Sequence, residues 1–207
     1  MNLARRLELL RLAGRSGAWV IEDDYDSEYL YTGRPLEALQ GLDTERRVVY
    51  VGTFRKVLFP ALRLGYLVVP PDLVDAFVAA RELTDRHPPT VEQAVLVEFI
   101  AGGHFVRHLR RMRSRYAARA SCAGRGDLRA LLDASPAGSG LHLVGWLPEG
   151  VDDREASKRA TREGVEAPAI SLYRTRPDGQ GGLMLGYAAV HESEIRDGVR
   201  RLAKALG

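Results

Sequence analysis

The chain has 207 residues, of which 45% are apolar, and 30 basic against 27 acidic residues give a net charge of +3. That length suffices for one large and one small domain, and the weak, dispersed charge is not a strong nucleic-acid signature. A single cysteine, Cys122, excludes a disulfide framework within the chain, and no apolar run reaches transmembrane length. The charged N-terminus does not resemble a signal peptide, so we expect a cytoplasmic protein with no membrane partner.

The first half of the chain predicts helices alternating with strands. Apolar residues from Leu3 to Ala13 recur at helical spacing, and this helix is expected to end at Gly14 or Gly17. A short apolar strand, expected to be buried, runs over 18–21 and leads into an acidic loop. Further strands are expected over 47–51 and 64–69. Polar residues at the carboxyl end of a buried strand are typical of ligand sites in α/β folds.

The second half begins with helices and ends in a mixed layer. Helices are expected over 72–84, from a Thr90 cap to about 100, and over an arginine-rich stretch, 104–120, that could resume after 126. The remaining expected elements are a strand over 141–147, a helix over 153–163, an extended piece over 165–170, a strand over 183–189 and a helix over 192–205. We therefore predict an α/β fold with residues 1–103 in a large domain and 104–207 forming a long helix and a small α+β domain.

Lys56 stands out among the basic residues. Only three of the 30 are lysine, and Lys56 alone lies in a short loop between two predicted strands, whereas Lys158 and Lys204 lie in polar helical patterns. A lysine amine can lose its proton and condense with a carbonyl group, which a guanidinium cannot do. Taken alone, such a lysine is more often a solvated surface charge.

Polar residues on either side of Lys56 strengthen the chemical interpretation. They are Asp23, Asp24 and Tyr25 after the first strand, Thr53 in the lysine loop, and Arg63 seven positions after the lysine. Together they supply what a pyridoxal phosphate site needs: an amine for the aldehyde, a carboxylate for the pyridine nitrogen, a phenol for the ring oxygen, and phosphate ligands. The two aspartates could instead cap a helix or bind a hard cation, and Arg63 could form an ordinary ion pair.

Several segments resemble one protein family. They are 21–29 (IEDDYDSEY), 35–36 (PL), 38–40 (ALQ), 50–56 (YVGTFRK), 62–66 (LRLGY), 140–143 (GLHL) and 183–188 (LMLGYA). Together they resemble the aminotransferase-like domain of MocR/GabR-type regulators of the GntR superfamily. That domain is related to the fold-type I, or class I/II, aminotransferases. The resemblance covers essentially the whole chain.

The resemblance implies a partial fold-type I large domain followed by a small C-terminal domain, working as a transaminase or as the effector-sensing part of a regulator. Lys56 would form the Schiff base with pyridoxal 5′-phosphate, Asp23 would pair with the pyridine nitrogen, and Tyr25 would bond the ring hydroxyl. Thr53 and Arg63 would hold the phosphate. A small amine or amino acid would be the ligand, and the chain would form a homodimer.

The chain departs from the family pattern in three places. Arg55 stands where the family usually has serine, so a hydroxyl near the phosphate is replaced by a cation. Met184 stands where many relatives carry an arginine that clamps a substrate carboxylate, and Arg174 is a possible substitute. The chain also begins ahead of the aspartate strand, without the helix-turn-helix and the first half of the cofactor domain, which predicts an N-terminally truncated protein with no DNA-binding module.

Two other classes of function are alternatives. A truncated, non-catalytic remnant would associate through apolar surface and bind no cofactor. The arginine-rich helix could contact DNA, but it contains only Tyr116 for stacking, so a solvated helix face is the simpler interpretation. The histidines lack metal-ligand spacing with Cys122, so no metal site is predicted.

Overall fold

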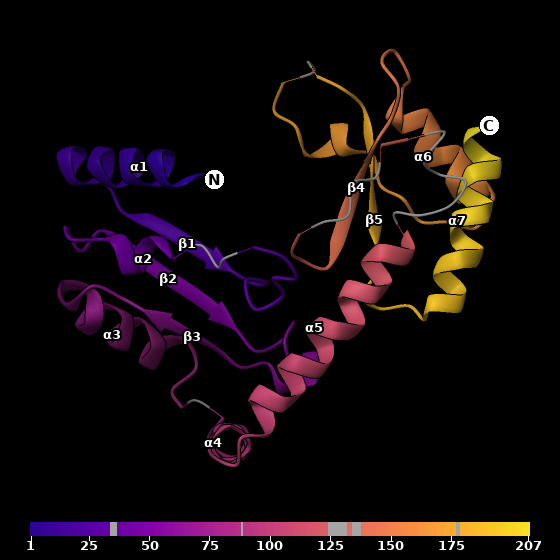
Figure 1. Ribbon diagram of the computed structural model, residues 1–207. Coiled ribbons are helices and arrows are strands. Elements are labelled where there is room, and N and C mark those ends of the chain that lie inside the picture. Colours follow the sequence, from indigo (N-terminus) through magenta and orange to yellow (C-terminus); the bar gives the residue numbers. More distant parts are fainter. Residues whose placement is uncertain (34–36, 88, 124–131, 134–137, 177–178) are drawn as a thin grey trace. The chain divides into compact units, whose positions relative to one another are not determined.

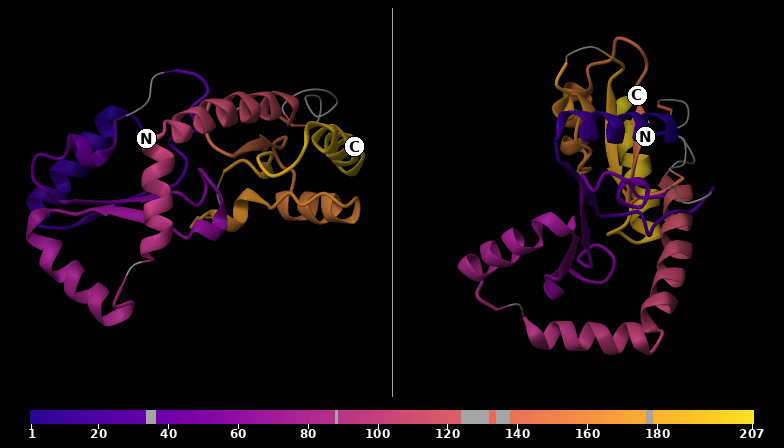
Figure 2. Two further views of the ribbon diagram at one scale, coloured as in Figure 1. Left: turned by 90° about the horizontal axis from the view of Figure 1, so that it is seen from below. Right: turned by 90° about the vertical axis from the view of Figure 1, so that its left-hand side faces the viewer.

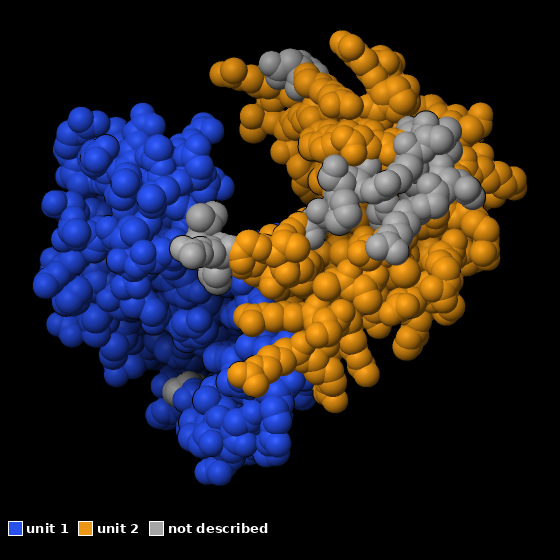
Figure 3. Space-filling model, in the orientation of Figure 1, with its two compact units in different colours: residues 1–28, 34–109 blue, residues 29–33, 110–207 orange. Residues whose placement is uncertain are grey.

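The structure is a computed structural model that describes residues 1–33, 37–87, 89–123, 132–133, 138–176 and 179–207. The chain divides into two compact units, with residues 1–28 and 34–109 in the first and residues 29–33 and 110–207 in the second (Figure 3). Each unit has a sheet and a hydrophobic core of its own. The division into 1–103 and 104–207 expected from the sequence stays a prediction.

The first unit is built on a three-stranded sheet. Its strands are β1 (Val20–Asp24), β2 (Val48–Thr53) and β3 (Gly65–Val68), in the order β1-β2-β3 (Figure 1). β1 and β2 are parallel, whereas β2 and β3 are antiparallel. All three strands were predicted from short apolar runs, and the structure confirms them. The acidic loop expected to begin at Glu22 was wrong at its start, because β1 continues through Asp24. The parallel pairing brings the carboxyl ends of β1 and β2 to one edge of the sheet.

Helix α1 (Leu3–Ser16) packs against one face of this sheet together with the short helix α2 (Leu39–Leu42) (Figures 1 and 2). The Asn2 side chain accepts a hydrogen bond from the Arg5 amide at the start of α1. Gly17 ends the helix with a φ of 68°, a left-handed conformation that glycine adopts at little cost. The prediction of a helix ending near Gly17 is therefore confirmed.

The expectation that the first strand is buried was wrong for one of its faces. Side chains alternate along a strand, so Val20 points toward α1 and α2 while Ile21 points to the opposite side. Ile21 is 74% exposed, although Val49, its partner in register on β2, is buried. The apolar composition of the strand indicated a buried environment, but Val20 packs toward α1 and α2 while Ile21 stays exposed.

Three helices follow the sheet. They are α3 (Val74–Thr84), which continues the 3₁₀ turn η2 (Pro71–Leu73), then α4 (Thr90–Ala101) and α5 (His104–Ala123). The predicted cap at Thr90 was wrong, because the extended residue before the helix is Pro89 and Thr90 already lies in the first turn. Glu92 lies in that turn as predicted. The expected resumption of the arginine-rich helix after 126 lies outside the described residues.

The second unit has a two-stranded antiparallel sheet of β4 (His142–Trp146) and β5 (Gly182–Gly186). Two helices, α6 (Asp153–Arg162) and α7 (Glu192–Leu206), contribute to the same core. These strands and helices were predicted within a few residues. The end of the extended piece at 165–170 instead begins a short 3₁₀ helix, η4 (Ile170–Tyr173).

Residues 29–33 belong to the second unit although they follow β1 in the sequence. The Tyr29 carbonyl accepts a hydrogen bond from the Gly140 amide at 2.9 Å, and the Tyr31 hydroxyl donates to the Gly140 carbonyl. Tyr187, which is fully buried, donates to that same carbonyl at 2.7 Å. This shared acceptor fixes the 29–33 segment against the strand that follows residue 140.

The 35–36 segment of the family motif lies outside the described residues. Among the described helices, none is both long enough and apolar enough to cross a membrane.

Candidate functional site

The edge of the sheet where β1 and β2 end carries the first group of candidate residues. Asp23 pairs in register with Val51, and Thr53 is the last residue of β2. Because side chains alternate along a strand and registered positions share a face, Asp23 and Thr53 project from the same face of the sheet. Asp23 is exposed. The predicted acid and the predicted phosphate ligand therefore lie on one face near one edge.

Tyr25 follows β1 directly and is 41% exposed. Partial burial raises the pKa of its phenol, and the negative charges of Asp26 and Asp23 raise that pKa further. The phenol therefore stays protonated at neutral pH and can donate a hydrogen bond to an oxygen of a ligand.

The loop after β2 is held by its apolar residues. The Phe54 amide donates to the Leu64 carbonyl at 3.0 Å, and the Phe54 ring packs edge-on against Phe105. Val57 is almost fully buried, and its carbonyl lies 2.9 Å from a ring nitrogen of His108. Lys56, between these anchored residues, is exposed. The loop thus fixes the backbone of Lys56 while its side chain stays accessible.

A 3₁₀ turn, η1 (Pro60–Leu62), returns the chain to β3 and ends at Arg63. Arg63 has a φ of 48°, in the left-handed region, and its amide donates to the Pro60 carbonyl. This turn brings Arg63 to the side of Thr53, because Thr53 pairs in register with Gly65 two residues later. The left-handed conformation is uncommon for a residue with a Cβ, because it is energetically unfavourable for such a residue.

Thr53, Arg55 and Arg63 line one cavity of about 630 Å³. Its other lining residues are Pro60, Ala61, Leu64 and Gly65. The Arg55 amide donates to the Thr53 hydroxyl oxygen at 3.2 Å, which leaves the hydroxyl hydrogen available to a ligand. Two guanidinium groups and a hydroxyl suit the several acceptor oxygens of a phosphate.

The structure therefore gathers the two expected phosphate ligands, but not every expected residue, around one cavity. Asp23, Tyr25 and Lys56 are not among the residues that line it. Their assignments stay predictions.

A tyrosine pair on the other face of the sheet escaped the sequence reasoning. The Tyr50 hydroxyl donates to the Asp24 carboxylate at 2.7 Å, and the Tyr50 and Tyr66 rings lie 6.0 Å apart. Burial, then the hydrogen bond to Asp24, raises the pKa of Tyr50 well above its ordinary value. Tyr66 covers Gly52, where a Cβ would collide with the Tyr66 ring. Strand alternation puts positions 22, 24, 50 and 52 on one face and could have signalled this cluster.

Asp24 thus serves as an acceptor for Tyr50 and for the Ser27 amide. Among the described residues, no three histidine, cysteine, aspartate or glutamate side chains gather closely enough to hold a metal ion.

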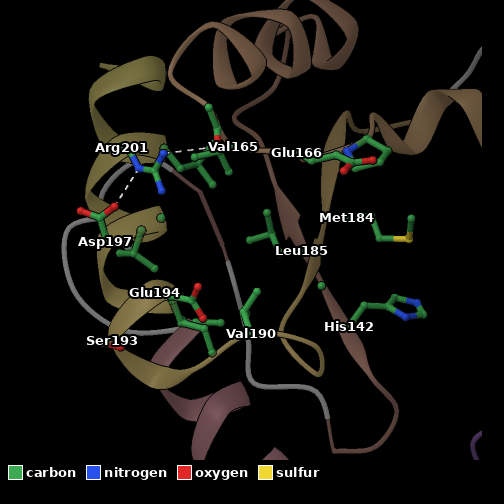
Figure 4. Close-up of a pocket in the computed structure, with 18 of the residues that line it drawn as sticks. His142, Val165, Glu166, Met184, Leu185, Val190, Ser193, Glu194, Asp197 and Arg201 are labelled. Atoms are coloured by element: carbon green, nitrogen blue, oxygen red, sulfur yellow. Dashed lines mark hydrogen bonds and ion pairs between the residues drawn. The ribbon is translucent and has the colours of Figure 1, made fainter. Parts of the chain in front are cut away.

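The second unit has a larger cavity of about 840 Å³ between β4, β5 and α7 (Figure 4). Met184 and His142 line it from the strands, and Glu194, Asp197 and Arg201 from the helix. The helix residues are engaged locally: Glu194 accepts from the His191 amide, and Asp197 pairs with Arg201 at 2.9 Å.

Arg174, the possible substitute for a carboxylate clamp at Met184, points elsewhere in the second unit. It donates to the Gln180 carbonyl at 2.6 Å, and its guanidinium lies over the Trp146 ring. Trp146 pairs with Gly182, at the opposite end of the two-stranded sheet from His142.

Helix α5 carries the arginines considered for DNA contact. Arg107 donates to the Gly102 carbonyl that precedes the helix, and Arg119 donates to the Ala188 carbonyl and lies over Tyr116. Both side chains therefore have local structural partners.

Comparison with solved structures defines the class of fold. Over its whole length the chain superposes on Pyrococcus horikoshii kynurenine aminotransferase, solved with PMP, with a TM-score of 0.88 and 30% identity, covering 52% of that chain. It also matches the Thermus thermophilus α-aminoadipate aminotransferase LysN with a TM-score of 0.84 and 29% identity, covering 54% of that chain. The chain has the aminotransferase fold, and the predicted fold class is confirmed.

Comparison with curated proteins adds the regulators. The chain is 40% identical over 211 residues to the probable rhizopine catabolism regulatory protein MocR of Rhizobium meliloti, covering 100% of this chain and 42% of that protein. No family model matches the chain. Its homologues are thus MocR-type regulators and aminotransferases, as the motifs predicted. The chain spans about half the length of the curated relatives it matches.

Proposed function

We propose that this chain is the pyridoxal phosphate-binding, aminotransferase-like part of a protein related to the MocR-type regulators. The observation that supports this most directly is the cavity shared by Thr53 and Arg63, the two residues expected to hold the phosphate. The fold of the solved aminotransferases and the similarity to MocR support it independently. When bound, the cofactor supplies a protonated ring that withdraws electrons from the α-carbon of an amine.

The residues of the chain have separate tasks in this proposal. Lys56 would hold the aldehyde of the cofactor through its Nζ, and its exposure in an anchored loop would leave room for an incoming amine. Asp23 keeps the pyridine nitrogen protonated, and the Tyr25 phenol donates to the ring oxygen. Thr53 and Arg63 bind the phosphate.

Whether turnover follows decides between a transaminase and an effector sensor. Both would need an amine ligand to reach the cofactor beside Lys56. An amino acid substrate also needs a cation for its carboxylate, and Met184 stands at the position where the family resemblance expects one. We therefore favour sensing of a small amine by a cytoplasmic homodimer over turnover of an amino acid.

The exposed apolar side chains of the first unit favour a second candidate function, that of a non-catalytic remnant. Ile21, Leu67 and Val91 are 74%, 49% and 71% exposed, which is unusual for large apolar side chains in one compact unit. A non-catalytic remnant would associate through this surface and bind no cofactor. Light scattering of the purified chain measures the association that both candidates allow, and cofactor binding separates them.

The decisive experiment is reductive trapping. Addition of pyridoxal phosphate is expected to give a visible absorption band, and borohydride followed by peptide mass spectrometry is expected to locate the adduct on Lys56. Lys56→Ala abolishes the band. Lys158→Ala is the matched control, since Lys158 is an exposed lysine paired with Glu155 on α6 and should leave the band unchanged. A folded wild-type chain that gives no band, or an adduct elsewhere, supports the remnant.

A further inference from the structure

The cavity around Thr53 carries more positive charge than one phosphate-binding arginine would supply. Arg55 and Arg63 both line it, and none of its lining residues is acidic. Within the part of the chain that the structure describes, neither guanidinium has an ion pair or a hydrogen-bond acceptor. Some arginines elsewhere are engaged, as Arg119 is with a backbone carbonyl and Arg201 with Asp197.

Two arginines that line one cavity without an acidic neighbour are stabilised by an anion bound there. The backbone supports this arrangement on both sides. The Arg55 amide is hydrogen-bonded to the Thr53 hydroxyl oxygen, and the left-handed turn at Arg63 ends η1 beside the strand that pairs with Thr53.

The chemistry of the donor set selects the ligand. Each guanidinium presents N–H groups in a planar fork that matches two oxygens of a phosphate, and the Thr53 hydroxyl adds one donor. A phosphate monoester is close to dianionic at neutral pH and can use both cations. A neutral alcohol in the same place would leave both charges uncompensated.

We propose that Arg55 is a second phosphate-binding arginine, which acts with Arg63 and Thr53 to make this site selective for a phosphorylated ligand. The inference rests on the proposed function for the identity of the cofactor. The related family usually has serine at this position, so Arg55 replaces a neutral donor with a charged, forked one. The side chain contributes affinity for the phosphate and leaves the chemistry at Lys56 unchanged.

The test uses two probes that separate the phosphate from the aldehyde. Pyridoxine 5′-phosphate has the phosphate but no aldehyde, so it cannot react with Lys56. Pyridoxal has the aldehyde but no phosphate. Calorimetry measures the affinity of each variant for pyridoxine 5′-phosphate, and reductive trapping with pyridoxal measures the reactivity of Lys56.

Arg55→Ser is expected to weaken binding of pyridoxine 5′-phosphate roughly ten- to one-hundred-fold, the effect of losing a charge-assisted hydrogen bond. Trapping of pyridoxal should be unchanged. Arg81→Ser removes an exposed charge from α3, outside the cavity, where Arg81 pairs with Asp85, and should alter neither measurement. Circular dichroism confirms that each variant is folded.

Wild-type affinity for pyridoxine 5′-phosphate in Arg55→Ser overturns the inference, and so does a folded wild-type chain that does not bind this probe. The proposed function fails differently: the wild type would bind pyridoxine 5′-phosphate, but neither pyridoxal nor pyridoxal phosphate would be trapped on Lys56.

Discussion

Replacement of Asp153 tests the packing of the second unit most sharply. Asp153 lies in the first turn of α6 and is only 4% exposed. Its carboxylate accepts hydrogen bonds from the Ser171 amide at 2.9 Å, the Ser171 hydroxyl at 2.6 Å and the Gly182 amide at 3.2 Å. One side chain therefore joins α6 to η4 and to the start of β5.

The expected cost follows from those three bonds. Asp153→Ala removes the acceptor and leaves the amides of Ser171 and Gly182 without a partner. A buried donor left unsatisfied costs about 1–3 kcal/mol, so we expect a loss of about 3–5 kcal/mol in the free energy of unfolding. That is a large part of the stability of a typical domain.

Urea unfolding monitored by tryptophan fluorescence measures this loss. The chain has one tryptophan in each unit, Trp19 and Trp146, so a Trp19→Phe background reports the second unit alone. Asp152→Ala, which removes the N-cap of α6, should cost about 1 kcal/mol. Asp197→Ala removes exposed ion pairs and should cost less than about 1 kcal/mol.

The pH dependence gives an independent check. Burial opposes ionisation of Asp153, but the hydrogen bonds from Ser171 and Gly182 and the charge of Arg174 outweigh it and lower the pKa below its ordinary 3.8. A lowered pKa contributes stability that is complete above pH 3.8 and is lost as the pH falls through the folded-state value. The difference in the free energy of unfolding between wild type and Asp153→Ala should therefore become smaller below pH 3.8. The reasoning would be refuted if Asp153→Ala lowered the free energy of unfolding no more than Asp197→Ala does. It would also be refuted if the difference between wild type and Asp153→Ala stayed constant as the pH falls below 3.8.

Two further predictions concern the tyrosines and the first unit. Burial and hydrogen bonds raise the pKa values of Tyr31 and Tyr50, so in an ultraviolet titration both should ionise only well above the ordinary pKa of 10, and stability should fall as the pH rises past 10; ionisation of every tyrosine near pH 10 would contradict this. The Glu22 carboxylate accepts from the Leu39 and Gln40 amides at the start of α2, at 2.8 and 3.0 Å. Glu22→Gln keeps only one acceptor oxygen and should lower the free energy of unfolding by about 1 kcal/mol. Urea unfolding in a Trp146→Phe background, which leaves Trp19 as the reporter, measures this loss. An unchanged unfolding midpoint would show that α2 does not need this cap.

Local patterns in the sequence predicted the elements well. The helical repeat from Leu3 to Ala13 with Gly17 behind it defined α1, because helix periodicity and a left-handed end residue are properties of neighbouring residues. Thr53 and Arg63 could be predicted from the sequence for the same reason. Both flank one short loop, and the return of that loop to β3 brings them together.

The sequence could not predict which faces are covered. The run ending in Ile21 has the composition of a buried strand, but only one side of β1 packs against α1 and α2. Composition records the apolar content of a strand, whereas burial depends on what lies against each face.

The sequence by itself therefore determined the elements, the aminotransferase-like class and the small set of polar residues at the strand ends. Only the tertiary structure showed that Arg55 shares a cavity with Arg63, and that the hydroxyls of Tyr31 and Tyr187 meet at the Gly140 carbonyl. These contacts depend on strand register and chain return, because residues far apart in sequence become neighbours only when the sheet pairs and its loops close.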